Sequence, residues 1–162
     1  MSESNSGPED RRAAELPLES LAIAAGLDAG ELEVLHDTLK REMLNATEVL
    51  FRERERGDRL YLLASGKLAI VLRGAGGSRC VMTYGPGAML GEASFLERAR
   101  RPATATAAED SVVYSLSRPA LEALAAEHPT LVNKVLLNLG RHLSERLREA
   151  PEVLRKLSDS SG

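Results

Sequence analysis

Between residues 49 and 114 the chain consists of short β-prone runs separated by turn-forming residues, and this pattern constrains the fold more than any other feature. The runs are rich in Val, Leu, Ile and Tyr, while the breaks contain Gly, Pro, Asp and Ser, which suit tight turns. Because hairpin follows hairpin, a jelly-roll-like antiparallel roll of about eight strands is favoured over parallel βαβ units. The strand-like runs span 49–51, 60–63, 68–72, 80–84, 103–107 and 112–114.

Helix-forming patterns precede this β-prone region. Apolar residues from Leu18 to Ala24 predict a short helix that ends near Gly26, since a glycine can adopt the left-handed cap conformation. Asp28 has the side chain of an N-cap, and the apolar residues after it are close to helical spacing. The sequence therefore predicts a mainly β fold with N-terminal helices.

Two further helices are predicted after the strands. Pro119 suits the first turn of one, which should stop near His128 and Pro129. A longer amphipathic helix follows, and Pro151 is expected to end or kink it. Its apolar stripe indicates core packing, with dimerisation as a second interpretation. The stripe comprises Leu131, Val135, Leu136, Leu139, Leu143 and Leu147.

We predict one domain, residues 16–150, between two terminal segments. The length of 162 residues, with 43% apolar and 28% charged residues, suits one ordinary globular core and leaves no room for a second domain. Residues 1–15 are rich in Ser and Glu without an apolar period, so a disordered tail is expected there. Residues 151–162 are expected to form a helical extension or a tail.

Charge and composition argue against several function classes. A net charge of -3 gives no general attraction to nucleic acids or anionic membranes, and no apolar run is long enough for membrane insertion. The single cysteine, Cys80, cannot close an intrachain disulfide, so a soluble cytoplasmic protein is predicted. The three histidines are scattered and no catalytic signature is present, so we predict no enzyme activity, no metal site and no cofactor.

The segment from residue 85 to 107 interrupts the alternation of strands and turns. A glycine turn leads into a short helix predicted at 91–96, whose leading amides and dipole suit an anion. Arg101 lies close by in sequence, and a guanidinium can bind two phosphate oxygens at once. Glu92 is an acceptor beside this anion site, which makes sense for a ligand that also presents a hydroxyl, as a ribose does.

These residues resemble the phosphate-binding cassette of the cyclic-nucleotide-binding domain family. The cassette match consists of Gly91-Glu92, a short apolar helix, and Arg101 followed by Ala103-Thr104. Signatures such as Gly57 to Leu62, Ser65-Gly66 and Gly85 to Gly87 occur upstream in the family's order, and the similarity extends over roughly residues 18–148. The C-terminal helical region looks most similar to bacterial copies appended to transporters of the sulfate-permease type and to some glutaminases.

The resemblance implies a role for each matching residue. Gly91 and Ser94 would offer backbone amides to the cyclic phosphate, Arg101 would pair with its exocyclic oxygens, and Glu92 would accept the ribose 2′-hydroxyl. Ala103 and Thr104 would form a strand wall behind Arg101. The remaining candidates are an apolar floor of Met89 and Leu90, and a lid on the last helix comprising Asn138, Leu139, Arg141 and His142.

The chain also departs from the family pattern. Pro102 stands where a small residue usually contributes an amide and sometimes a hydroxyl, and the loss of one charged hydrogen bond weakens binding by about 1.5 to 3 kcal/mol. Because a hydroxyl there often favours guanine, cyclic AMP is expected over cyclic GMP. The turn at Arg54-Glu55-Arg56 also differs, and we expect it to leave the pocket unaffected.

Two interpretations remain open from the sequence. The chain is either a ligand sensor whose last helix closes over the base, or a degenerate module of the same fold in which the last helix contacts an effector protein or a second copy. A transcription factor of this family would continue into a helix-turn-helix, so no nucleic-acid binding is expected.

Overall fold

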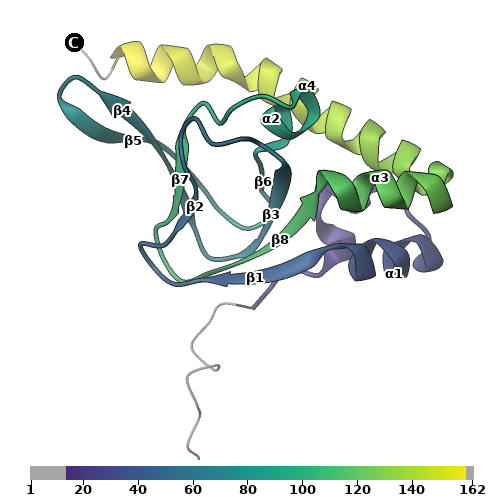
Figure 1. The fold of residues 1–162 in the computed structure, drawn as a ribbon. Helices are drawn as coiled ribbons and strands as arrows, with labels where there is room; N and C mark the ends of the chain where they lie inside the picture. The colour runs from purple at the N-terminus through teal and green to yellow at the C-terminus, as the bar shows by residue number, and fades with distance from the viewer. Residues whose placement is uncertain (1–13, 160–162) are drawn as a thin grey trace, which may run out of the picture.

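The computed structural model describes residues 14–159, which fold into a β-roll at one end and a group of helices at the other (Figure 1). The prediction of a tail at 1–15 falls almost entirely on residues outside this range. In chain order the elements are η2 (Leu18–Ser20), η3 (Ala22–Ala24), α1 (Ala29–Thr38), β1 (Lys40–Leu44), β2 (Val49–Phe51), β3 (Arg59–Ser65), β4 (Leu68–Gly74), β5 (Gly77–Tyr84), β6 (Met89–Leu90), α2 (Glu92–Glu97), β7 (Thr104–Ala107), β8 (Ser111–Ser117), α3 (Arg118–Glu127) and α4 (Pro129–Asp159).

The strands form two antiparallel four-stranded sheets, with the orders β1-β8-β3-β6 and β2-β7-β4-β5. This arrangement confirms the prediction of an eight-stranded antiparallel roll with flanking helices, counted over residues 14–159. The runs at 49–51 and 68–72 coincide with β2 and with most of β4. The strands β1 and β6 were not among the runs singled out, because β1 is largely charged and β6 has only 2 residues.

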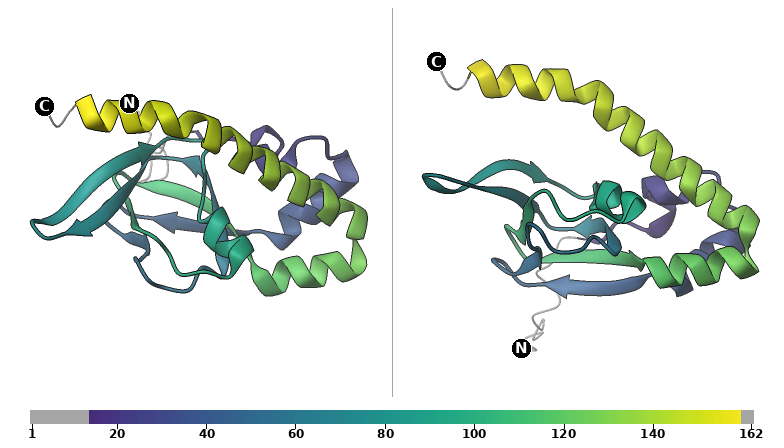
Figure 2. Two further views of the ribbon diagram at one scale, coloured as in Figure 1. Left: turned by 90° about the horizontal axis from the view of Figure 1, so that it is seen from above. Right: turned by 45° about the horizontal axis from the view of Figure 1, so that its top comes forward.

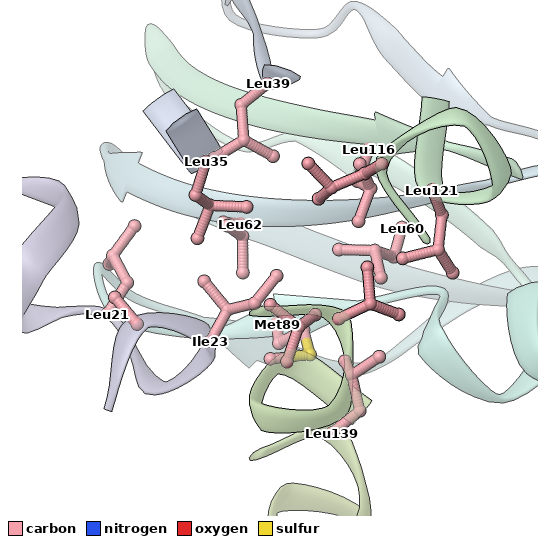
Figure 3. Packing of buried hydrophobic residues seen from close by; sticks show 14 of the residues in the cluster. Leu21, Ile23, Leu35, Leu39, Leu60, Leu62, Met89, Leu116, Leu121 and Leu139 are labelled. Atoms are coloured by element: carbon pink, nitrogen blue, oxygen red, sulfur yellow. The ribbon is translucent and has the colours of Figure 1, made fainter. Parts of the chain in front are cut away.

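Strand β3 separates two hydrophobic cores. Its side chains alternate between faces, so Leu60 and Leu62 pack against the helices while Tyr61 and Leu63 face the interior of the roll. Burial on both sides explains why six of its seven residues are buried. The helix-side core, in which Leu62 lies beside Ile23 and Leu35, is drawn in Figure 3.

The N-terminal helices form where the sequence predicts them, in modified form. The segment before Gly26 makes two short 3₁₀ turns, and Gly26 has the left-handed φ of 74°. Asp28 caps α1 in a capping box, in which its side chain accepts from the Glu31 amide and the Glu31 carboxylate accepts from the Asp28 amide.

Helix α4 runs from the helical end of the molecule across to the side of the β4–β5 hairpin (Figure 2). It is anchored near its start, because Lys134 donates to both carboxylate oxygens of Glu31 and the buried Asn138 side chain donates to the carbonyls of Ile23 and Ala25. Pro151 does not end the helix, which continues through this residue to Asp159; a kink at Pro151 stays a prediction. An exposed helical segment tolerates the missing N–H because water can bond the freed carbonyl.

Candidate ligand-binding site

A cavity of about 160 Å³ lies between α2, the strands of the roll and the middle of α4. Its walls are mostly apolar, and three charged side chains, from Glu92, Arg101 and Arg146, reach it. A largely apolar pocket with a few convergent polar groups is the usual form of a small-molecule site. The other lining residues are Phe51, Ile70, Tyr84, Leu90, Gly91, Ala93, Ser94, Pro102 and Ala103.

Gly91 allows α2 and Arg101 to approach each other closely. It is the N-cap of α2 in the left-handed conformation, with φ 76°. A Cβ atom at this position would overlap Nη1 of Arg101 and would lie 3.1 Å from its Cζ and 3.3 Å from the Arg59 carbonyl oxygen. Both the backbone conformation and the space therefore require glycine here.

Arg101 holds a buried guanidinium against this turn. The residue is 3% exposed, and its Nη1 and Nη2 donate to the carbonyls of Gly91 at 2.9 Å and Arg59 at 2.6 Å. Its Cζ lies 4.3 Å from the centroid of the Phe51 ring, a cation–π contact. Burial lowers the pKa of the guanidinium from its ordinary value, because it disfavours the charged form. A nearby anion would stabilise that charged form. The Nε atom is buried and has no hydrogen-bond partner among the described residues.

The turn at residues 54–56 holds the backbone of Arg101. The Arg54 amide donates to the Arg101 carbonyl at 2.8 Å, and the Arg101 amide donates to the Glu55 carbonyl at 2.8 Å. Arg54 adopts a positive φ of 70° to make this pairing. The turn therefore supports the backbone of Arg101 through main-chain bonds, and the expectation that its changed sequence leaves the pocket unaffected stays a prediction.

Glu92 is the acidic partner in the cavity, and it is 1% exposed. Its Oε1 accepts from Nη1 of Arg146 at 2.7 Å, and Nε2 of His142 lies 3.9 Å from the same oxygen. Its Oε2 is buried and has no partner within residues 14–159. Since buried polar atoms are nearly always hydrogen-bonded, three unpaired atoms call for an explanation: Oε2 of Glu92, Nε of Arg101 and Nε2 of His142.

Most of the predicted site residues line this cavity, and two do not. The side chain of Met89 points away into the helix-side core. Thr104 faces the opposite side of its sheet, where its hydroxyl accepts from the Glu53 amide at 3.0 Å, so it does not form the wall behind Arg101. The predicted residues at the cavity are Leu90, Gly91, Glu92, Ser94, Arg101, Pro102 and Ala103.

Of the predicted lid residues on α4, one lies near the cavity and the others do not. Asn138 and Leu139 are buried against the N-terminal turns and the helix-side core, which removes them from the cavity. Arg141 is exposed, and its Nη1 lies 3.5 Å from the Asn138 side-chain oxygen. Of the four, only His142 lies near Glu92.

Sequence reasoning missed several residues of the cavity. Phe51 and Ile70 were predicted only as strand residues, and Tyr84 was seen only as the end of a strand, although its ring lies 4.9 Å from the Arg146 guanidinium. Arg146 was missed altogether. The one signal in the sequence is its position four residues after His142, one helical turn further along the same face.

Two further properties of residues 14–159 bear on the class of site. No helix in this range is long and apolar enough to cross a membrane. The same residues contain no cluster of three or more His, Cys, Asp or Glu side chains placed to hold a metal ion.

The roll and its cavity define a ligand-binding domain of regulatory type. The family model for the cyclic nucleotide-binding domain matches residues 41–128, and the chain belongs to this family. Among curated proteins, the chain is 34% identical over 134 residues to the "Cyclic AMP receptor protein" of Thermus thermophilus. It is 31% identical over 122 residues to the "CRP-like cAMP-activated global transcriptional regulator" of Mycobacterium tuberculosis.

Solved structures agree with this assignment. A cyclic nucleotide-binding domain from Methylobacillus flagellatus matches with a TM-score of 0.75 and 30% identity, covering 80% of this chain and 74% of the other. The regulatory domain of Toxoplasma gondii PKA, solved with cAMP, matches with a TM-score of 0.58 and 29% identity, covering 65% of this chain and 41% of the other.

The chain spans only part of its curated relatives. The match covers 82% of this chain and 60% of the Thermus receptor. For the Mycobacterium regulator it covers 75% of this chain and 54% of the relative. An Aspergillus fumigatus lysophospholipase, nte1, is 34% identical over 107 residues, which are 64% of this chain and 7% of that protein. The suggested likeness to domains of transporters and glutaminases, and the expected absence of nucleic-acid binding, stay predictions.

Proposed function

We propose that this chain is a regulatory sensor domain that binds cyclic AMP in the cavity between α2 and α4 and catalyses no reaction. The ligand would be held by its cyclic phosphate at Arg101 and by its ribose at Glu92. Helix α4 would act as the lid, through the turn that carries His142 and Arg146. An effector protein would bind differently according to the position of this helix, in keeping with a cytoplasmic signalling role.

The observation that carries this proposal is that two residues lining one cavity, Arg101 and Glu92, each have a buried atom without a partner among the described residues, Nε and Oε2. One is a charged donor and the other is a charged acceptor. Leaving such groups buried without partners is unfavourable, which favours a ligand that supplies both an anion and a hydroxyl donor. A nucleoside 3′,5′-cyclic phosphate carries both groups, since its 2′-hydroxyl is free.

Arg101 retains enough donors to bind a phosphate without releasing the backbone. A guanidinium has five N–H groups, and the bonds to Gly91 and Arg59 use one on each Nη atom. The Nε–H and the neighbouring Nη–H form a fork that matches two phosphate oxygens. The two carbonyl bonds would thus hold the guanidinium in place for its ligand.

Cyclic AMP is preferred over cyclic GMP because of Pro102. The proline lines the cavity but has neither an amide hydrogen nor a hydroxyl to offer a guanine. A relative named a cyclic AMP receptor protein and a similar structure solved with cAMP support the same choice.

Titration calorimetry with cyclic AMP and cyclic GMP tests the proposal. Wild-type protein should bind cyclic AMP, and Arg101→Ala should abolish the heat. Arg101→Lys, which keeps the charge but loses the fork, should weaken binding by about ten-fold or more. Arg98→Ala is the matched control, because Arg98 is exposed and pairs with Glu122 away from the cavity.

A second candidate is a degenerate module that binds no nucleotide and contacts a partner or a second copy through α4. The exposed leucines of that helix favour it: Leu137, Leu147 and Leu154 are 61%, 75% and 66% exposed. No heat from wild-type protein at millimolar nucleotide, together with a dimer in light scattering, would support this candidate over the first.

A further inference from the structure

Arg146 connects the last helix directly to the ligand cavity. Its Nη1 donates to Oε1 of Glu92 at 2.7 Å, and its Nη2 donates to the carbonyl of Met89 at 2.8 Å. Its Cζ lies 4.9 Å from the centroid of the Tyr84 ring. Three contacts from three different elements, α2, β6 and β5, fix the guanidinium beside the carboxylate.

The Glu92 carboxylate is occupied on one side only. Arg146 uses Oε1, while Oε2 is buried and has no partner in the described part of the chain. A buried carboxylate next to a site for a phosphate requires a compensating positive charge, since two negative groups repel each other. Arg146 supplies that charge and leaves one oxygen, Oε2, without a partner in the described part of the chain.

We propose that Arg146 is a positioning residue for ribose recognition: it balances the charge of Glu92 and orients the carboxylate so that Oε2 accepts the ligand's 2′-hydroxyl. This inference rests on the proposed function. It makes α4 part of the site before any ligand enters, because the ribose acceptor is held from that helix. The affinity for a ligand with a free 2′-hydroxyl would thus depend on whether α4 is packed against the cavity.

The geometry predicts that Arg146 affects affinity mainly through one ligand atom, the oxygen of the 2′-hydroxyl. Removing the guanidinium frees the carboxylate to rotate and leaves it without a counter-charge, which weakens its bond to the hydroxyl. A nucleotide that lacks this hydroxyl makes no such bond, so it should lose only the smaller part of the affinity that comes from the charge balance between Glu92 and the phosphate. The structural anchors of α4, at Lys134 and Asn138, are separate from Arg146, so the helix should remain folded on the domain.

The test is a cycle of two ligands, cyclic AMP and 2′-deoxy cyclic AMP, with four proteins: wild type, Arg146→Ala, Arg146→Lys and Arg148→Ala. Arg148 is an exposed arginine on the same helix and serves as the matched control. Arg146→Ala should lower the affinity for cyclic AMP about ten-fold or more, as expected for a charged hydrogen bond, and change that for the deoxy ligand less than about three-fold. Arg146→Lys should restore part of the loss, and Arg148→Ala should match wild type.

Each other outcome overturns the inference. An equal loss for both ligands would mean that Arg146 supports the cavity generally, and tighter binding by Arg146→Ala would mean that the bridge competes with the ribose. Circular dichroism and melting temperatures of the variants separate these results from misfolding, in which case Arg146→Lys carries the test. Failure of wild-type protein to bind either nucleotide would instead overturn the proposed function itself.

Discussion

Replacing Gly91 with alanine would place a methyl group where the Arg101 guanidinium lies. Two effects add. The left-handed φ of 76° is unfavourable for alanine by about 1–2 kcal/mol, and the methyl displaces Nη1 from its carbonyl, losing a charged hydrogen bond of about 1.5–3 kcal/mol. The expected destabilisation is about 2.5–5 kcal/mol. Displacement of the guanidinium should also reduce cyclic AMP affinity at least about ten-fold.

Gly26→Ala separates the two effects. Gly26 has nearly the same φ of 74°, but a Cβ atom there meets nothing within 4 Å. This variant should therefore lose only the backbone term of about 1–2 kcal/mol and bind cyclic AMP like wild type. Urea denaturation followed by circular dichroism measures the stabilities, and calorimetry measures the affinities. Equal destabilisation of the two variants, with equal affinities, would refute the packing of Arg101 against Gly91.

Two further substitutions test how α4 is held. Asn138→Ala leaves two carbonyls, those of Ile23 and Ala25, without their donor. The loss at the buried Ile23 carbonyl should destabilise the domain by about 1–3 kcal/mol, and the loss at the part-buried Ala25 carbonyl by less. Urea denaturation measures the change, and an unchanged midpoint would contradict the anchoring role. The hydrogen bond from Lys134 lowers the pKa of Glu31, so its stabilisation is present at neutral pH and is lost as the pH falls through the lowered pKa of the folded state. Lys134→Met should melt at a lower temperature than wild type at pH 7, and the difference should shrink in acid; a difference independent of pH would show that the bridge is not its source.

The parts of the fold that local patterns predict are those in which each strand carries its own apolar signal. Strand β3 is an example, since Leu60 to Leu63 are apolar and buried on both faces. Strand β1 carries no such signal, because Lys40, Arg41 and Glu42 are charged and the strand forms only by pairing with β8 much later in the chain. Long-range pairing of this kind is not encoded in a local window.

The residues of the candidate site also differ in whether a local sequence pattern predicts them. Gly91, Glu92 and Arg101 come from one short segment, where glycine and helix-cap chemistry are visible in the sequence. Arg146 reaches the same cavity from 54 residues beyond Glu92. Its place depends on the path of α4, which Asn138 and Lys134 set by contacts with the N-terminal segment, so spacing alone could not have placed it.

A crystal structure of the domain grown with cyclic AMP tests the central claim most directly. The phosphate oxygens should lie within hydrogen-bond distance of Nε of Arg101, and the 2′-hydroxyl should lie on Oε2 of Glu92. The guanidinium should still be bonded to the carbonyls of Gly91 and Arg59. A nucleotide bound elsewhere on the molecule, or an Arg101 side chain turned away from the phosphate, would contradict the account.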